Sequence, residues 1–120
     1  MNVLYSARVP RISQRHADAR RRQILTAARI CFTRDGLTRT TMQDIFRESG
    51  LSPGAVYTYF YGKDEIVREV AEEALQGEPD PRLAVQLWAE ALHDARIMQL
   101  VRRTEPGLRA QLLEAALRPW

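Results

Sequence analysis

The stretch TTMQDIFRESGLSPGAVYTYF, residues 40–60, decides the predicted fold of this 120-residue chain. Thr41 and Ser52 are residues that cap helix starts, and each precedes a short segment with helical spacing of its apolar side chains. Gly50 can take the left-handed conformation that ends a helix, and Pro53 suits the first turn of the next one. Two helices joined by a short turn containing glycine form a helix-turn-helix. The stretch therefore predicts this motif.

The other segments beyond the amino terminus also have helical spacing, and none alternates like a strand. We therefore predict an all-α fold, in which a three-helix helix-turn-helix domain over residues 18–62 follows a basic, flexible arm over 1–17. A fourth, linking helix and a short helical region then complete residues 63–120. The predicted helices are 18–35, 40 or 41 to 49, 53–61 and 63–76. Three further helices follow: one that begins at Asp80-Pro81 and packs through the stripe Ala84, Leu87, Trp88, Ala91 and Leu92, one that carries Ile97, Leu100 and Val101, and one that carries Leu108, Leu112, Ala116 and Leu117.

Charge is distributed unevenly along the chain. Residues 1–63 carry eleven basic side chains against four acidic ones, whereas residues 64–120 carry seven against eleven, and the total is +3. This pattern either indicates a polyanion-binding face in the first half or is a chance asymmetry of surface charge. A spread of 45% apolar and 28% charged residues is that of an ordinary soluble protein.

Several classes of protein are disfavoured. The apolar runs are too short to span a membrane, and no secretory signal is visible, so we expect a cytoplasmic, nucleoid-associated protein. The single cysteine, Cys31, lies on the apolar stripe of the first helix and is expected to be buried. His16 and His93 have no partner at metal-ligand or catalytic spacing, so we expect no metal, no cofactor and no enzymatic activity.

The third predicted helix has two unlike faces. Val56 and Phe60 share one side and are expected to dock on the second helix. The opposite side carries the small residues Gly54, Ala55 and Thr58, with tyrosines at its edges. Such a helix can approach another surface closely, and the major groove of DNA admits one α-helix.

Phosphate contacts are expected beside this helix. Lys63 combines an ammonium group with the free amides of the following helix start, and Thr41 offers a hydroxyl with free amides. Tyr59 is expected to point outward and contact DNA, whereas Tyr57 is divided between core and contact, and Tyr61 is expected to be structural or solvated. The triplet at 20–22, three arginines, is either a solvated helix face or a set of contacts to the DNA backbone.

Residues 22–75 resemble the DNA-binding domain of the tetracycline-repressor (TetR) family. The resemblance covers about half of the chain and keeps many positions in register. The shared positions are Ile24, Ala27, Ala28, Phe32, Gly36, Thr41, Asp44, Ile45, Gly50, Leu51, Ser52, Gly54, Val56, Tyr57, Tyr59, Phe60 and Lys63.

The resemblance implies a bacterial transcriptional regulator, in most cases a repressor, that binds a palindromic double-stranded operator as a homodimer and releases it on binding a small-molecule effector. The DNA-contacting residues that it implies are Thr41, Gln43, Ser52, Pro53, Gly54, Ala55, Tyr57, Thr58, Tyr59 and Lys63. Two positions depart from the family pattern: Phe46 replaces a small alanine, and Ala55 replaces a hydroxyl residue.

The second domain, which holds the effector pocket and the dimer interface in this family, is normally much longer than residues 78–120. The chain is therefore expected to be a fragment, a truncated member, or a protein that pairs through another surface. The alternative function is a helical interaction module that heterodimerises with a longer regulator and modulates it.

Overall fold

The computed structural model describes residues 10–77 and 80–103, together with residues 110, 113 and 117. This part of the chain is helical and contains no strand, which confirms the all-α class. Its helices are α2 (Pro10–Asp35), α3 (Met42–Ser49), α4 (Pro53–Tyr59), α5 (Lys63–Gln76), α6 (Pro81–Ala91) and α7 (Ala95–Arg103).

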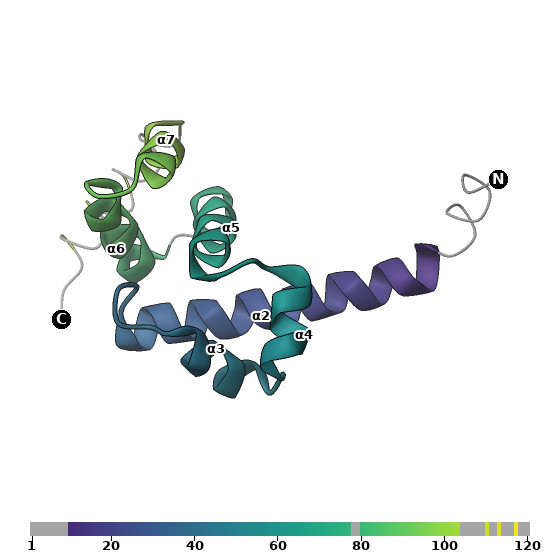
Figure 1. Ribbon diagram of the computed structural model, residues 1–120. Helices are drawn as coiled ribbons and strands as arrows, with labels where there is room; N and C mark the ends of the chain where they lie inside the picture. Colours follow the sequence, from purple (N-terminus) through teal and green to yellow (C-terminus); the bar gives the residue numbers. More distant parts are fainter. Residues whose placement is uncertain (1–9, 78–79, 104–109, 111–112, 114–116, 118–120) are drawn as a thin grey trace.

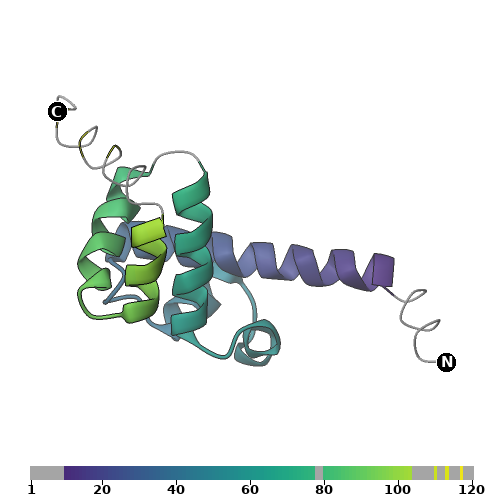
Figure 2. The same ribbon diagram turned by 90° about the horizontal axis from the view of Figure 1, so that it is seen from above.

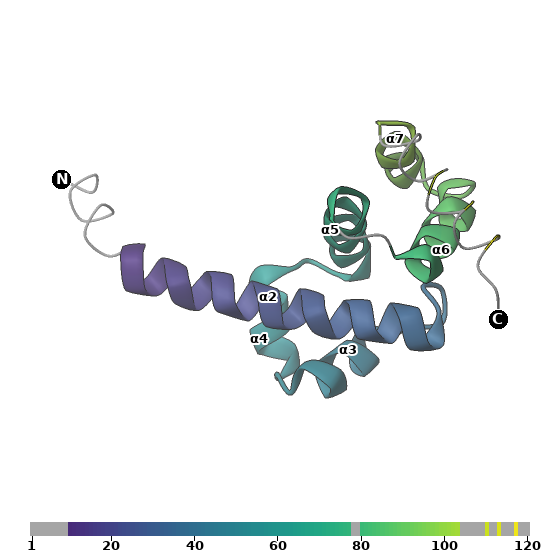
Figure 3. The same cartoon turned by 180° about the vertical axis from the view of Figure 1, so that it is seen from behind.

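Helix α2 is the longest element, and the others lie on two sides of it (Figure 1). Helices α3 and α4 lie on one side, and α5, α6 and α7 lie on the other, an arrangement that Figure 3 shows from behind. Viewed from above, α5, α6 and α7 stand next to each other, while the amino-terminal half of α2 extends beyond them (Figure 2). The helix-turn-helix and the carboxy-terminal helices therefore share α2 as a common support.

The apolar stripes predicted from the sequence form one core. The stripe of α2 is buried together with apolar residues of every following helix. Its largest fully buried side chains are Phe32, Phe60, Ile24, Ile45, Ile66, Leu83, Leu87, Ile97, Val56 and Val70. Burial of Ile97, Leu100 and Val101 confirms the predicted inner face of α7.

The predicted start of the first helix at Asp18 was wrong, because α2 begins at Pro10. The side chains of residues 13–16 are exposed, so this segment has no apolar face from which a period could be recognised. Its arginines, glutamine and alanine nevertheless favour a helix, and proline is well suited to the first turn. The prediction of an arm therefore fails for residues 10–17, and residues 1–9 lie outside the described part.

The recognition-type helix is shorter than predicted, because α4 ends at Tyr59 rather than Tyr61. Phe60 leaves the helix in an extended conformation (φ −136°, ψ 137°), and its ring is buried in the core. Because this ring is buried in the core, the helix ends three residues before Gly62. Tyr61 is then left 95% exposed, as its solvated alternative predicted.

Two residues of the predicted α6 stripe are not in the core. Trp88 is 39% exposed and Leu92, which follows the helix end, is 71% exposed, although Ala84, Leu87 and Ala91 are buried as predicted. The last predicted helix lies largely outside the described residues; of its stripe, only Leu117 is described, and it is exposed. Among the described helices, none has the length and hydropathy needed to cross a membrane.

Candidate nucleic-acid interface

The amino terminus of α3 is closed by a capping box. The Thr41 hydroxyl accepts a hydrogen bond from the Asp44 amide (3.2 Å), and the Thr41 amide donates to the Asp44 carboxylate (2.9 Å). The hydrogen bond that the Thr41 amide donates to this carboxylate is the largest cause that holds the pKa of the Asp44 carboxyl below its ordinary value. The predicted amide-plus-hydroxyl site at Thr41 is therefore reduced, since the amide is engaged and only the hydroxyl proton can be donated to a phosphate.

Helix α4 follows α3 after a turn in which Gly50 has a positive φ of 74°. A residue with a side chain would be strained in this conformation, which explains glycine at this position. The Ser52 hydroxyl accepts a hydrogen bond from the Ala55 amide (3.2 Å), and Pro53 occupies the first turn. Val56 and Ile45 are fully buried, so α4 is held against α3 and the core by its inner face.

Most of the predicted DNA-contacting residues lie at the surface. Apart from its chain neighbours and the backbone of its own helix, Gly54 has no atom within 4 Å of the place a Cβ would occupy, so its outward side is open. The Thr58 hydroxyl donates to the Gly54 carbonyl (2.8 Å), which leaves the Thr58 oxygen available as an acceptor. The exposed members of the set are Thr41, Gln43, Ser52, Pro53, Gly54, Tyr57 and Thr58, while Ala55, Tyr59 and Lys63 are half-buried.

Of the three tyrosines of this segment, Tyr59 is the one whose environment differs from the prediction. Tyr59 was expected to point outward, but it is half-buried and packs against the core. Tyr57 is the more accessible ring at 50% exposure, and it contacts Phe46 edge-to-face with 5.7 Å between ring centroids. The large ring of Phe46, which departs from the family pattern, therefore supports Tyr57 at the edge of α4.

Lys63 begins α5 and turns toward the loop before α3. Its ammonium group donates to the Thr38 carbonyl (3.2 Å), which uses one of three donors. Burial lowers the pKa of this ammonium below its ordinary value, although the negative charge of Glu90 acts in the opposite direction. Gly62 provides no side-chain cap for α5, so no side chain caps the first amides of that helix, and the phosphate site at Lys63 stays a prediction.

Sequence reasoning missed Arg21, which secures the end of α4. Its guanidinium lies 4.7 Å from the centre of the Phe60 ring and donates to the Tyr59 carbonyl (3.3 Å). The same group forms an ion pair with Glu69 of α5. These partners lie more than thirty residues away along the chain, so no local pattern could have indicated the contact.

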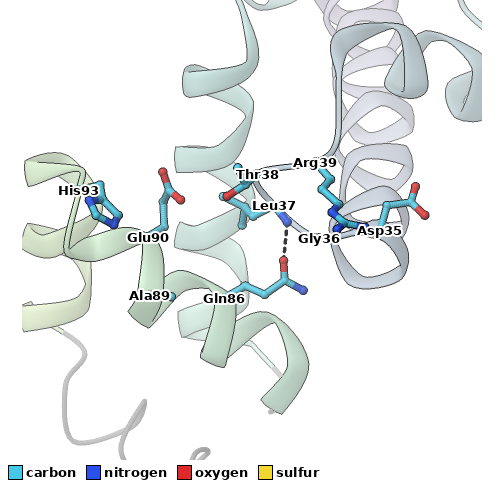
Figure 4. Close-up of a pocket in the computed structure, with 9 residues that line it drawn as sticks. All are labelled: Asp35, Gly36, Leu37, Thr38, Arg39, Gln86, Ala89, Glu90 and His93. Carbon is cyan, nitrogen blue, oxygen red and sulfur yellow. Dashed lines mark hydrogen bonds between the residues drawn. The ribbon is translucent and has the colours of Figure 1, made fainter.

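Sequence reasoning also missed Gln86, which joins α6 to the turn that precedes α3 (Figure 4). Its carbonyl oxygen accepts a hydrogen bond from the Leu37 amide (2.5 Å), and its amide group donates to the Phe32 carbonyl (2.9 Å). A surface hollow of about 390 Å³ lies beside it, lined by Asp35, Gly36, Leu37, Thr38, Arg39, Gln86, Ala89, Glu90 and His93. In the described residues, no three histidine, cysteine or acidic side chains come together as a metal site.

Residues 24–70 match the model of the bacterial regulatory proteins of the tetR family. The chain is 42% identical over 66 residues to YfiR of Bacillus subtilis, described as an uncharacterised HTH-type transcriptional regulator, covering 55% of this chain and 32% of YfiR. It is 38% identical over 65 residues to the HTH-type transcriptional repressor Rv1474c of Mycobacterium tuberculosis, covering 54% and 35% of the two chains. It is 29% identical over 107 residues to the HTH-type transcriptional regulator TtgR of Pseudomonas putida, covering 75% and 51%.

The fold is also found in a solved structure. GusR of Salmonella enterica superimposes with a TM-score of 0.58 at 21% sequence identity, over 78% of this chain and 64% of GusR. The chain spans about a third to a half of the length of these three curated relatives. The matched segment contains α3, α4 and the buried half of α2, whose packing is described above. Residues 24–70 therefore form a helix-turn-helix domain of the kind found in the tetR family of bacterial regulatory proteins.

Proposed function

We propose that this protein is a sequence-specific regulator of transcription, acting as a repressor, that inserts α4 into the major groove of a palindromic operator. It would act in the cytoplasm on the nucleoid. Base contacts would come from residues 52–59, while Thr41, Gln43 and Lys63 would contact the backbone and the groove edge. The curated relatives support this proposal, since they are named as transcriptional regulators and one as a repressor.

The observation that carries the proposal is the contrast between the two faces of α4. Val56 on the inner face is completely buried, while Gly54 on the outer face has open space above it. A helix that is held firmly and has only small side chains on its outer face can lie deep in a groove, where the side chains at its sides reach base edges. Phosphate contacts would then supply most of the affinity, and base contacts would supply the specificity.

Selection of bound fragments from a random DNA pool tests the proposal directly. We expect an enriched palindromic motif with half-sites separated by about one helical turn of 10 base pairs, or a multiple of it. Footprinting should then protect two major-groove segments on one side of the duplex. Recovery of unenriched DNA, together with equal binding to selected and scrambled duplexes, would contradict sequence-specific recognition.

A second candidate is a helical module that pairs with another regulator, and the outer face of α6 favours it. Val85, Trp88 and Leu92 are exposed at helical spacing, being 51%, 39% and 71% accessible. The same face would serve the homodimer that the family resemblance implies. Light scattering after size exclusion distinguishes the candidates, because a stable homodimer favours direct operator binding, whereas a monomer that associates only with a longer regulator favours the module.

A small-molecule effector is the remaining part of the proposal and rests on the family resemblance. Its expected signature is release of the selected duplex when the effector is added. A screen of metabolite and drug pools against the preformed complex, read by fluorescence anisotropy, would identify it. Continued binding in the presence of every pool would speak against effector control.

A further inference from the structure

The three arginines at 20–22 of α2 differ in their partners. Arg21 forms an ion pair with Glu69, and Arg22 forms one with Glu73, so both are tied to α5. Arg20 is not in an ion pair with any residue that the structure describes, and its side chain is exposed. Of the three, Arg20 alone therefore presents a cation that its surroundings leave unneutralised.

Arg20 is nevertheless held in place. Its guanidinium donates to the Gln23 side-chain carbonyl (2.7 Å), and the Gln23 amide group donates to the Ser49 main-chain carbonyl (2.7 Å). The Ser49 carbonyl can only accept, so the Gln23 amide nitrogen must face it and its oxygen must face Arg20. Because Ser49 is the last residue of α3, this relay places the guanidinium beside the turn that leads into α4.

Arg20 and the phosphate-binding residues already predicted lie at opposite ends of α3. Thr41 and Lys63 lie at the first end of α3, and Lys63 touches the loop before that helix. Arg20 lies at the other end, and the eight residues of α3 span about 12 Å. A guanidinium has five N–H donors, of which Gln23 takes one, and the planar fork suits a phosphate.

We propose that Arg20, positioned by Gln23 through Ser49, binds a DNA phosphate beside the amino-terminal end of α4. This inference rests on the proposed function. The sequence left open whether the triplet at 20–22 contacts DNA, and the inference assigns the contact to Arg20 and its positioning to Gln23. Arg20 would bind the phosphate, whereas Gln23 would be a positioning residue. The contact would fix the depth and angle of α4 without reading a base.

Helix α2 offers a matched control in Arg15. Arg15 precedes Arg22 by seven residues, or about two turns, and so lies on the same side of α2, which faces α5. Arg20 precedes Gln23 by three residues and shares the side that faces α3. Both arginines are exposed on one helix, but only Arg20 faces the helix-turn-helix.

The test measures binding of the 120-residue chain to the duplex selected above and to a scrambled duplex, by fluorescence anisotropy between about 50 and 200 mM salt. For Arg20→Ala we expect the slope of log affinity against log salt to become shallower by about 0.9 per contacted phosphate. Affinity should fall by roughly fivefold to tenfold on both duplexes, because a phosphate carries no sequence information. Arg15→Ala should bind as the parent does.

Two further variants separate charge from positioning. Arg20→Lys should keep the salt slope and lose part of the affinity, since the charge stays but the fork geometry is lost. Gln23→Ala should also keep the slope and weaken binding, and thermal melting followed by circular dichroism checks that each variant is folded. An unchanged slope for Arg20→Ala, or an equal loss for Arg15→Ala, would overturn this inference alone. Failure of the parent to bind either duplex would instead overturn the proposed function, and this contact with it.

Discussion

Helices α4 and α6 begin alike but present opposite outer faces. Each starts with a capping residue followed by proline, Ser52-Pro53 in α4 and Asp80-Pro81 in α6, and each buries one side in the same core. The outer side of α4 carries small and polar residues around Gly54, whereas the outer side of α6 carries the exposed ring of Trp88. Local signals thus determine where a helix starts, but the outer face determines what it can bind.

The inner faces differ as well. Helix α4 is held by apolar side chains and by Arg21 at its end. Helix α6 is joined to α2 by the ion pair between Arg29 and Asp80 (2.9 Å) and by the Gln86 hydrogen bond to Phe32, and the second Gln86 hydrogen bond joins it to Leu37 in the turn after α2. Polar side chains therefore contribute to both attachments, through Gln86 in the middle of α6 and through Arg21 at the end of α4.

The largest effect is expected from filling the outer face of α4. Gly54→Leu adds a side chain where the protein leaves open space, so the free energy of unfolding should not fall. The same side chain would hold α4 away from the groove and weaken binding to the selected duplex by about a hundredfold, the cost of one to two base contacts. Anisotropy titration measures the binding, and chemical denaturation measures the stability.

Ala89→Leu is the matched control, because it places the same leucine side chain at an exposed position of α6. It should leave DNA binding within about twofold of the parent, since surface substitutions usually change energies by about 0.5 kcal/mol or less. Equal losses in the two variants would mean that the outer face of α4 has no special role.

The second-largest effect is expected on the free energy of unfolding, when the hydrogen bonds that attach α6 are removed. Gln86→Ala removes the acceptor of the Leu37 amide and one donor to the Phe32 carbonyl. The Phe32 carbonyl still accepts from the Gly36 amide (3.0 Å), but the Leu37 amide is left unpaired, and its loss of a partner should lower the free energy of unfolding by about 1–3 kcal/mol. Urea denaturation measures this change. Gln76→Ala, an exposed glutamine of α5, should change stability by about 0.5 kcal/mol or less.

The outer face of α6 provides a third test, with a smaller effect on stability. Leu92→Lys places a charge on the exposed apolar stripe and should change the unfolding free energy by only about 0.5 kcal/mol. It should nevertheless oppose pairing, because a buried and unpaired ammonium is strongly disfavoured at an interface. Light scattering should show association for the parent and a shift toward monomer for the variant. If the parent stays monomeric at every concentration, this face does not form a homodimer.

These helices also show how far a sequence can be interpreted. The starts of α3, α4 and α6 were predicted because a capping residue and a following proline or apolar stripe act within a few positions. The extension of α2 to Pro10 was missed because an exposed helix has no apolar period. The exposure of Trp88 and the burial of Tyr59 were missed because helical spacing does not reveal how many neighbours cover a stripe.

For the candidate site, the sequence predicted the exposed positions but not the residues that support them. The exposed positions around Gly54 follow from the helical period and from the burial of Val56. The supports of the site, namely Arg21, Gln23 and Gln86, bond to partners more than twenty residues away. Such contacts depend on how the helices pack, so only the structure could bring them to light.

The smallest expected effect is a change in stability at the start of α3, where Asp44 closes the capping box. The hydrogen bonds from Thr41 lower the pKa of this carboxyl in the folded state, so the stabilisation is present above the ordinary value of 3.8 and is lost as the pH falls through and below it. Asp44→Asn should therefore be less stable than the parent at neutral pH, and the two melting curves should converge in acid. Glu72→Gln removes a carboxylate from an exposed position of α5 and controls for the loss of charge. A stability difference for Asp44→Asn that persisted unchanged in acid would show that the side-chain geometry, rather than the carboxylate charge, holds the start of α3.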